Sequence, residues 1–237
     1  MVSQSGVGAT MTISGKYDRI GTTATVGTYC VQNNVWNAGT PQTLEVNYRT
    51  GAFTVKVAGH DMPTNGSPAS FASIFRGNHW GATTSASGMP KQVSNITRIS
   101  TSWIFRTVTS GAWNCVYDVW FHKTSDYKTG PYNGAELMIW LNYKGTIQPA
   151  GAKVATVYLA GATWEVWYAD WASFDYIAYR RTSTTTWACF DMNTFFKDSL
   201  SRGYIDGSWY LIAVEAGFEL WQNGAGLASR SFSVTVC

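Results

Sequence analysis

Two glutamates of this chain stand in surroundings where a carboxylate is costly. Glu136 lies in the apolar and aromatic run 135–141, and Glu219 lies in a similar run at 216–221. A carboxylate among apolar residues needs a partner or an open cleft, because burying an unpaired charge is unfavourable. Two carboxyl groups that face each other can cleave a glycosidic bond, one as acid and the other as nucleophile or base. We therefore predict that Glu136 and Glu219 face each other across a sugar-binding groove.

Strand geometry assigns neighbours to both carboxylates. If each run is a β-strand, successive side chains point to opposite faces. Glu136 then shares its face with Met138 and Trp140, and Glu219 shares its face with Trp221. Aromatic neighbours lower the local polarity and favour the protonated form of a carboxyl group.

Other acidic residues also stand in strand-like runs, so spacing alone does not single out a pair. Glu45, Glu165 and Asp118 have apolar neighbours along the chain. Glu215 precedes Glu219 by four positions and points to the same face of a regular strand. The residue types therefore leave several carboxylate pairs open.

The composition favours a β-rich protein with an uncharged polar surface. Charged residues are 13 % of the chain and aromatic residues 15 %, including 12 Trp and 13 Tyr, whereas typical soluble domains have roughly 25 % charged residues. Carbohydrate suits such a surface, because sugar faces stack on aromatic rings and sugar hydroxyls bond to amides. The net charge of +3 comes without a cluster of Lys and Arg, which argues against nucleic-acid binding. No apolar run approaches the roughly 20 residues of a membrane span.

Localisation and redox state are expected from the N-terminus and the cysteines. Residues 1–6 have neither the basic nor the apolar region of a secretory signal, and we expect a secreted protein whose signal has been removed. Cys30, Cys115, Cys189 and Cys237 show no metal-ligand spacing. Free thiols are favoured over a disulfide, because free cysteines often serve as small buried hydrophobic residues.

We expect residues 1–237 to form a single catalytic domain, since the chain has no repeat, linker or low-complexity segment. Short alternating runs separated by Gly, Asn, Ser and Pro predict an antiparallel sandwich or a closed barrel. A helix is expected over 191–202, capped by Asp191, with Phe195 and Phe196 on its apolar side. The expected strands are Tyr29–Val35, Thr43–Tyr48, Ala52–Ala58, Ser70–Arg76, Ile96–Ser100, Thr101–Thr107, Asn114–His122, Ala135–Tyr143, Lys153–Leu159, Ala162–Tyr168, Phe174–Arg181, Trp209–Phe218 and Ser231–Val236.

Five short motifs of the chain occur in the order in which one enzyme family carries them. They are Asn33-Asn34-Val35-Trp36, Tyr117-Asp118-Val119-Trp120, Glu136-Leu137-Met138-Ile139-Trp140, Trp164-Glu165-Val166-Trp167 and Ala216-Gly217-Phe218-Glu219-Leu220-Trp221. The chain thereby resembles glycoside hydrolase family 12, the small endo-β-1,4-glucanases and xyloglucanases. Five motifs in order are far more specific than any one of them.

The resemblance implies a fold and a mechanism. The fold is an all-β jelly-roll sandwich of two curved antiparallel sheets, with one short helix on the convex side and an open substrate cleft on the concave face. The mechanism is hydrolysis with retention of configuration, with Glu136 as nucleophile and Glu219 as acid and base. Asp118 would hydrogen-bond Glu136. In a retaining enzyme the two carboxyl groups lie about 5–5.5 Å apart.

The same resemblance implies the residues that contact the substrate. Trp36 would stack on a sugar of the glycone side, and Asn34 would bond a sugar hydroxyl. His79 and Trp80 match a pair that lies beside the family's cleft, and the loop 145–151 would cross the cleft. The expected substrate contacts are, in chain order, Asn34, Trp36, His79, Trp80, Met138, Trp140 and Trp221.

We therefore expect an endo-β-1,4-glucanase that cuts cellulose-type glucans internally. A xyloglucan-specific endoglucanase, a xylanase and a non-catalytic carbohydrate-binding sandwich are the alternatives. The expected partner is a β-glucan polysaccharide, with no nucleic acid or membrane, and the protein is expected to be a monomer. No cofactor and no metal are expected, because His residues and carboxylates do not cluster at ligand spacing.

Overall fold

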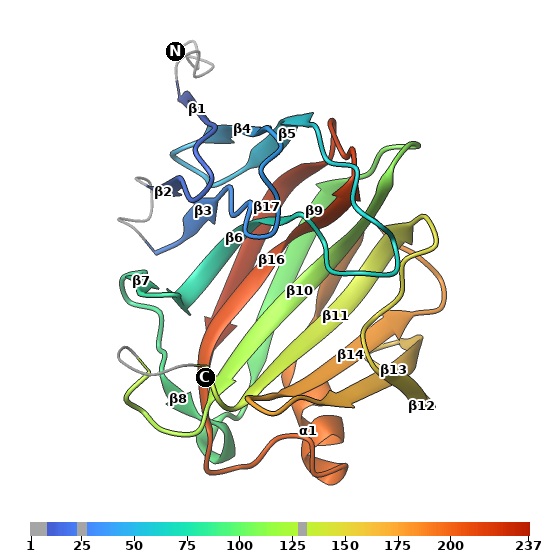
Figure 1. Ribbon diagram of the computed structural model, residues 1–237. Helices are drawn as coiled ribbons and strands as arrows, with labels where there is room; N and C mark the ends of the chain where they lie inside the picture. Colours follow the sequence, from blue (N-terminus) through green and yellow to red (C-terminus); the bar gives the residue numbers. More distant parts are fainter. Residues whose placement is uncertain (1–8, 23–27, 128–131) are drawn as a thin grey trace.

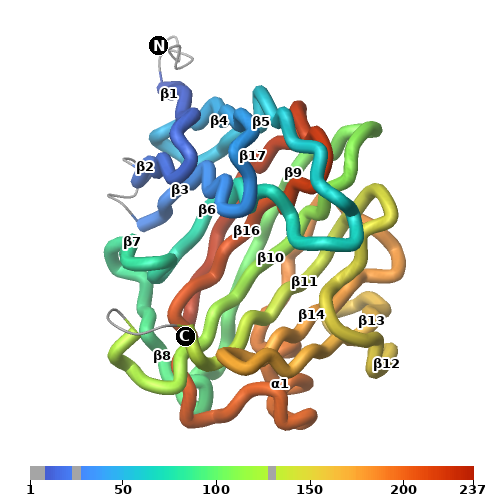
Figure 2. The backbone as a smooth tube through the Cα atoms, viewed as in Figure 1, coloured from blue at the N-terminus to red at the C-terminus, as the bar shows by residue number. Residues whose placement is uncertain are grey.

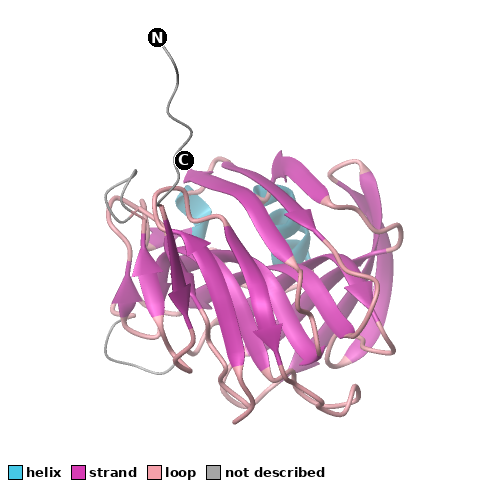
Figure 3. Cartoon of the chain, turned by 90° about the horizontal axis from the view of Figure 1, so that it is seen from above, coloured by secondary structure: helices cyan, strands magenta, loops and turns pink. Residues whose placement is uncertain are grey.

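Two β-sheets packed face to face make up most of the protein (Figures 1 and 3). The computed structural model describes residues 9–22, 28–127 and 132–237. The smaller sheet has the strand order β1-β4-β5-β17-β9-β15, and the larger sheet has the order β12-β13-β14-β11-β10-β16-β6-β3-β2. The predicted β-sandwich is therefore confirmed, and the sheets do not close into a barrel.

The strands of the smaller sheet are, in its order, β1 (Thr10–Ile13), β4 (Gln42–Asn47), β5 (Phe53–Ala58), β17 (Ala228–Val236), β9 (Ile99–Arg106) and β15 (Trp187–Asp191). Those of the larger sheet are β12 (Ala152–Leu159), β13 (Ala162–Asp170), β14 (Asp175–Arg181), β11 (Ala135–Lys144), β10 (Ala112–His122), β16 (Tyr210–Gln222), β6 (Ser70–His79), β3 (Cys30–Gln32) and β2 (Arg19–Gly21). Short strands β7 (Ala82–Thr83) and β8 (Lys91–Gln92) pair with β6 and β16, and the 3₁₀ turn η1 spans Val93–Asn95.

Alternation along β11 separates the core between the sheets from the opposite, concave face. Leu137 and Ile139 belong to the large apolar cluster between the sheets. Met138 and Trp140 belong to a second cluster, which also contains Trp221 of β16. The faces predicted for these strands are therefore correct, and one side of the larger sheet is left for a site.

Helix α1 (Asn193–Ser201) packs on the convex side of the larger sheet. The Phe195 ring lies 5.0 Å from that of Trp164, and the Phe196 ring lies 4.9 Å from that of Phe121. The predicted helix and its role in packing are confirmed, but its cap differs. Asp191 is the last residue of β15, and its carboxylate accepts hydrogen bonds from the backbone N–H groups of Asn193 and Ile99. The Asp191 carboxylate therefore links β9 to the first residue of α1, although Asp191 itself is not part of the helix.

One pair of strands departs from the antiparallel expectation. β14 runs parallel to β11, because the meander β12-β13-β14 returns beside β11 in the same direction. The loop 145–151 must then carry the chain from the end of β11 to the opposite end of the sheet, where β12 begins (Figure 2). Five residues of this stretch line the cleft described below, as predicted for a crossing loop.

The remaining differences concern edges and ends. Strands β1, β2, β7, β8 and β15 were not expected, and the expected strands Ile96–Ser100 and Thr101–Thr107 form the single strand β9. All four cysteines are free, in agreement with the favoured interpretation. The N-terminal residues 1–6, on which the expected secretion depended, lie outside the described residues.

Candidate active site

The concave face of the larger sheet carries a cleft of about 1040 Å³. Side chains of the central strands β11, β10 and β16 line it, and so do the loops 64–68 and 146–151. The Oγ1 atoms of Thr64 and Thr146 lie 2.8 Å apart, so a hydrogen bond joins these two loops. The cleft is thus built on rigid strands and bordered by connected loops.

Glu136 and Glu219 both line this cleft, on the two strands that flank β10. Glu136 lies opposite Trp120 of β10, and Glu219 lies opposite Asn114 further along the same strand. Burial raises the pKa of Glu136, and the neighbouring Glu219 carboxylate raises it further. Each negative charge disfavours the other, so the pair binds a proton more tightly than an exposed carboxyl group does.

Glu219 has a dedicated partner. Asn114 Nδ2 donates to Glu219 Oε2 at 2.5 Å, and the Glu219 N–H donates to Asn114 Oδ1 at 3.0 Å. Burial raises the pKa of Glu219 to about 7, although the Asn114 hydrogen bond acts in the opposite direction. Near neutral pH this carboxyl group can therefore both give and take a proton.

Asp118 lines the same cleft but does not make the predicted hydrogen bond to Glu136. Its Oδ2 accepts from Trp120 Nε1 at 3.0 Å, and its buried Oδ1 has no partner among the described residues. Burial raises the pKa of Asp118, and the charges of Glu136 and Glu215 add to the effect. Asp118 and Glu136 are therefore coupled through their electrostatics, and all three carboxyl groups of the cleft hold a proton more tightly than an exposed carboxyl group does.

The other acidic candidates lie elsewhere. Glu45 is on the smaller sheet, with one carboxylate oxygen 3.6 Å from Lys56 Nζ. Glu165 is bound by Lys153 Nζ at 3.0 Å and is not among the residues that line the cleft. Of the acidic candidates in strand-like runs, Glu45 and Glu165 therefore do not line the cleft, whereas Asp118, Glu136 and Glu219 do.

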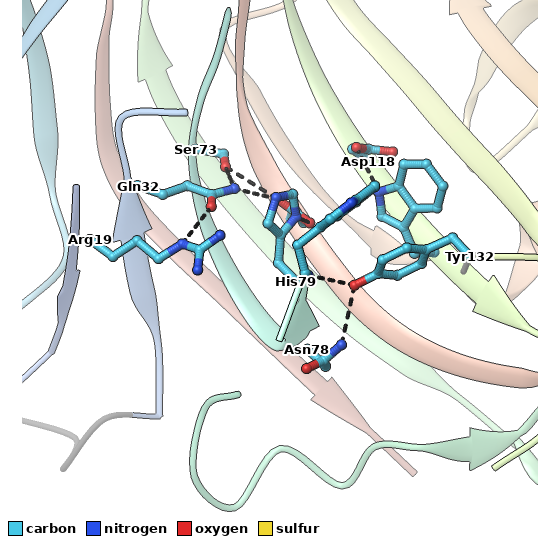
Figure 4. A network of polar contacts seen from close by, with 10 residues as sticks. Arg19, Gln32, Ser73, Asn78, His79, Asp118 and Tyr132 are labelled. Atoms are coloured by element: carbon cyan, nitrogen blue, oxygen red, sulfur yellow. Dashed lines mark hydrogen bonds and ion pairs between the residues drawn. The ribbon is translucent and has the colours of Figure 1, made fainter. Parts of the chain in front are cut away.

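Glu215 lies on β16 opposite Asp118 and is completely buried. Figure 4 shows the polar network to which its partners Gln32, Ser73 and His79 belong. Its Oε2 accepts from Ser73 Oγ and Gln32 Nε2, each at 3.2 Å, and its Oε1 lies 2.5 Å from His79 Nδ1. Every carboxylate oxygen of Glu215 is therefore bound within the protein.

All seven side chains predicted to contact substrate line the cleft. The side chains of Trp36 and Trp80 are 44 % and 53 % exposed, so neither ring is a core residue. Met138, Trp140 and Trp221 are almost fully buried and form its floor. The structure thus offers exposed rings above a buried aromatic floor.

Trp80 is held in a costly backbone conformation. Its φ is 42°, in the left-handed region that bulky side chains rarely adopt. Its N–H donates to Tyr132 Oη at 2.5 Å, and the two rings stack with centroids 4.0 Å apart. Tyr132 therefore compensates the strain and fixes the direction in which the exposed ring points.

Sequence reasoning missed some of the residues that line the cleft or support it. Trp171, 42 % exposed, stacks on Tyr176, whose strand position is opposite Glu136. Trp171 lies in the loop after β13, where alternation assigns no face. Asn114 left a usable signal, because it is a polar residue two strand repeats before Asp118 and thus on the same face.

The concave face of this two-sheet sandwich holds two partly buried carboxyl groups among aromatic rings, and such a pair can hydrolyse a glycosidic bond. The sequence model of glycosyl hydrolase family 12 matches residues 27–237. The chain belongs to this family. The prediction made from the five motifs is confirmed, and with it the jelly-roll sandwich and a retaining glycoside hydrolase.

Three known proteins illustrate the relationship. Endoglucanase cel12A from Rhodothermus marinus is 50 % identical, with a TM-score of 0.91, over 96 % of this chain and 99 % of that one. A metagenome-derived glycoside hydrolase family 12 endoglucanase is 46 % identical, with a TM-score of 0.92, over 96 % of this chain and 98 % of that one. The probable cellulase Cel12b of Mycobacterium tuberculosis is 34 % identical over 62 % of this chain and 97 % of its own length.

Two further findings concern the described ranges only. Within residues 9–22, 28–127 and 132–237, His, Cys, Asp and Glu side chains do not gather in threes that could hold a metal ion. In the same ranges, no helix has the length and apolar character needed to cross a membrane.

Proposed function

We propose that Glu136 is the nucleophile and Glu219 the acid and base of an endo-β-1,4-glucanase that acts with retention of configuration. The observation that carries the proposal is the placement of these two partly buried carboxyl groups on either side of β10 in a single cleft. Their expected separation of about 5–5.5 Å is the value for a retaining enzyme.

The reaction takes two steps. In the first step, Glu219 donates its proton to the glycosidic oxygen while the Glu136 carboxylate attacks the anomeric carbon, so the leaving chain departs with a hydroxyl group. A glycosyl ester of Glu136 remains. In the second step, Glu219 takes a proton from water, the water oxygen attacks the anomeric carbon, and Glu136 leaves as a carboxylate. Two inversions restore the original configuration.

Burial raises the pKa of both carboxyl groups, that of Glu136 to about 8 and that of Glu219 to about 7, so it favours the proton that Glu219 needs and opposes the ionisation that Glu136 needs. Glu219 needs its proton until the leaving group departs, and its raised pKa of about 7 keeps much of it protonated at neutral pH. Glu136 needs to be ionised, which is easiest when the other carboxyl groups nearby are neutral. Burial raises the pKa of Asp118, which favours its protonated, neutral form beside Glu136.

The cleft suits internal cleavage of a β-glucan chain. Trp36 presents its ring for stacking, and Asn34 lies beside it on the same cleft wall. We place Trp36 on the glycone side, with His79 and Trp80 along the wall near Glu136. Product release from carboxymethylcellulose, barley β-glucan, xyloglucan and xylan would distinguish a general β-1,4-glucanase from a xyloglucan-specific enzyme and from a xylanase.

Chemical rescue tests the two roles. With an aryl β-cellobioside that has a good leaving group, E219A should still form the glycosyl ester, and azide should restore turnover by giving the β-glycosyl azide. E136A should instead give the α-azide, because azide then replaces the nucleophile. The reverse pattern would exchange the roles. Full activity of E136Q on polymer would exclude the enzyme as proposed and leave a carbohydrate-binding protein.

We also propose that the protein acts outside the cell, as a monomer, with residues 1–237 as one catalytic domain. The large apolar cluster that extends from Ile13 to Val234 supports one domain, and a polymeric substrate is met outside the cell. Light scattering after size exclusion would test the monomer, and a mass near 26.0 kDa is expected.

A further inference from the structure

Glu215 is a buried carboxylate that the proposed mechanism does not use. It lies on the concave side of β16, four positions before Glu219, and has no solvent-exposed surface. A carboxylate in such a place needs several hydrogen-bond donors to be tolerated. Its donors therefore indicate what the residue is for.

The directions of the hydrogen bonds around Glu215 follow from the donors of the network, beginning with Arg19 on the edge strand β2; Figure 4 labels Arg19, Gln32, Ser73 and His79. Arg19 Nε can only donate, and it lies 3.3 Å from Gln32 Oε1, which fixes the orientation of the Gln32 amide. Gln32 Nε2 then donates to Ser73 Oγ at 3.0 Å and to Glu215 Oε2 at 3.2 Å. Ser73, which accepts from Gln32, donates its own proton to Glu215.

These hydrogen bonds also fix which ring nitrogen of His79 carries a proton. Glu215 Oε1 can only accept, so the Nδ1 atom of His79, 2.5 Å away, must carry a proton. The centroid of the His79 ring lies 5.6 Å from that of Phe75 and 4.7 Å from that of Trp80, and His79 lines the cleft. Nε2, the other ring nitrogen, has no hydrogen-bond partner in the described part of the chain.

We propose that Glu215 is a positioning residue, which holds the proton of His79 on Nδ1 and turns Nε2 toward the cleft to bind a hydroxyl group of the glucan. Glu215 itself touches no substrate; it acts through His79. The inference rests on the proposed function, because it names a substrate contact of the same cleft.

The position of the proton can be observed directly. The chain has three His residues, so a long-range ¹⁵N–¹H spectrum of the ¹⁵N-histidine-labelled protein shows three rings, and H79N identifies the ring of His79. We expect a proton on Nδ1 of His79 in the resting enzyme. In E215Q the amide oxygen should face Ser73 and Gln32 and the amide N–H₂ should face His79, so the proton should move to Nε2.

Kinetics on cello-oligosaccharides test the consequence for binding. H79N keeps a donor toward Glu215 but lacks the cleft nitrogen, and its KM should rise about fivefold with little change in kcat, as for the loss of one hydrogen bond. E215Q should raise KM to a similar extent, and the double variant should be no worse than H79N alone. E45Q, the same change at an exposed residue of β4 in the other sheet, is the matched control and should equal the wild type.

The results separate the inference from the proposed function. A wild-type spectrum with the proton on Nε2 alone, an E215Q spectrum unchanged at His79, or additive KM effects would each overturn the role of Glu215. A wild-type protein that cuts no β-glucan would refute the proposed function instead, and the spectra would still report where the proton lies.

Discussion

Replacing Glu219 by glutamine should stabilise the protein at alkaline pH and not at acid pH. Burial raises the pKa of Glu219 from 4.5 to about 7, so the folded protein binds this proton more tightly than the unfolded chain does. Between these two values the folded state holds more protons, and its free energy of unfolding must fall as the pH rises. Glutamine has the same shape as glutamate and cannot ionise, so E219Q removes this fall in the free energy of unfolding at alkaline pH.

The size of the effect follows from the two values. At 1.36 kcal/mol for each tenfold change in proton affinity, ionising Glu219 costs the folded state about 3 kcal/mol at pH 8. Below pH 4.5 the carboxyl group is protonated in both states, and this cost vanishes. The amide oxygen introduced by E219Q can still accept from Asn114, so the variant keeps that hydrogen bond. The substitution also removes the charge that raises the pKa of Glu136, which can add to the gain.

Urea unfolding of wild type and E219Q at pH 4, 6 and 8 measures the difference. E219Q should match the wild type at pH 4 and exceed it by about 3 kcal/mol at pH 8. E45Q, which changes an exposed carboxylate that lies 3.6 Å from Lys56, controls for the general loss of a negative charge and should show no such rise. A difference between E219Q and wild type that is constant across pH, or that shrinks toward pH 8, would refute the argument that burial governs this group.

Three further predictions concern the neighbours of the catalytic pair. N114A removes the hydrogen bond that favours ionised Glu219, so the alkaline limb of the kcat/KM profile should move to higher pH. An unchanged alkaline limb would show that Asn114 does not influence the pKa of the catalytic acid. W171A should raise KM for polymer several-fold and leave aryl cellobioside hydrolysis unchanged, because its exposed ring lines the cleft beyond Tyr176. G217A should lower the free energy of unfolding by about 2 kcal/mol or more, since a Cβ there would overlap the carbonyl oxygen of Ala72; stability equal to the wild type would show that β16 and β6 can separate.

Alternation explains why much of the site could be predicted. On β11 the period of two residues places Glu136, Met138 and Trp140 on one face, and that face lines the cleft. The same argument holds on β16 for Glu219 and Trp221, although the predicted strand ended at Phe218 and the actual strand continues to Gln222. The two-residue period and the apolar context of a run thus predict which face of the sheet each side chain occupies, but they predict the ends of a strand poorly.

Contacts between strands could not be predicted in this way. Tyr176 lies opposite Glu136 only because β14 returns parallel to β11, a pairing that depends on the path of the loop 145–151. Trp171 depends on the same path, because it stacks on Tyr176 from a loop. The missing bond between Asp118 and Glu136 has another cause, because facing the same cleft does not decide which atoms pair. Asp118 Oδ2 accepts from Trp120 Nε1, and its Oδ1 has no partner among the described residues.

The spacing along β16 accounts for the way in which Glu215 can serve the site without disturbing Glu219. Four residues of strand separate the two carboxyl groups by about 13 Å, and Glu215 is not among the groups that shift the pKa of Glu219. On the other side it lies opposite Asp118 and raises the pKa of Glu136, which opposes the ionised state that a nucleophile needs. The three donors from His79, Ser73 and Gln32 offset this charge locally. The network around Glu215 is therefore needed as much for Glu136 as for His79, and loss of a donor should reduce the ionisation of the nucleophile.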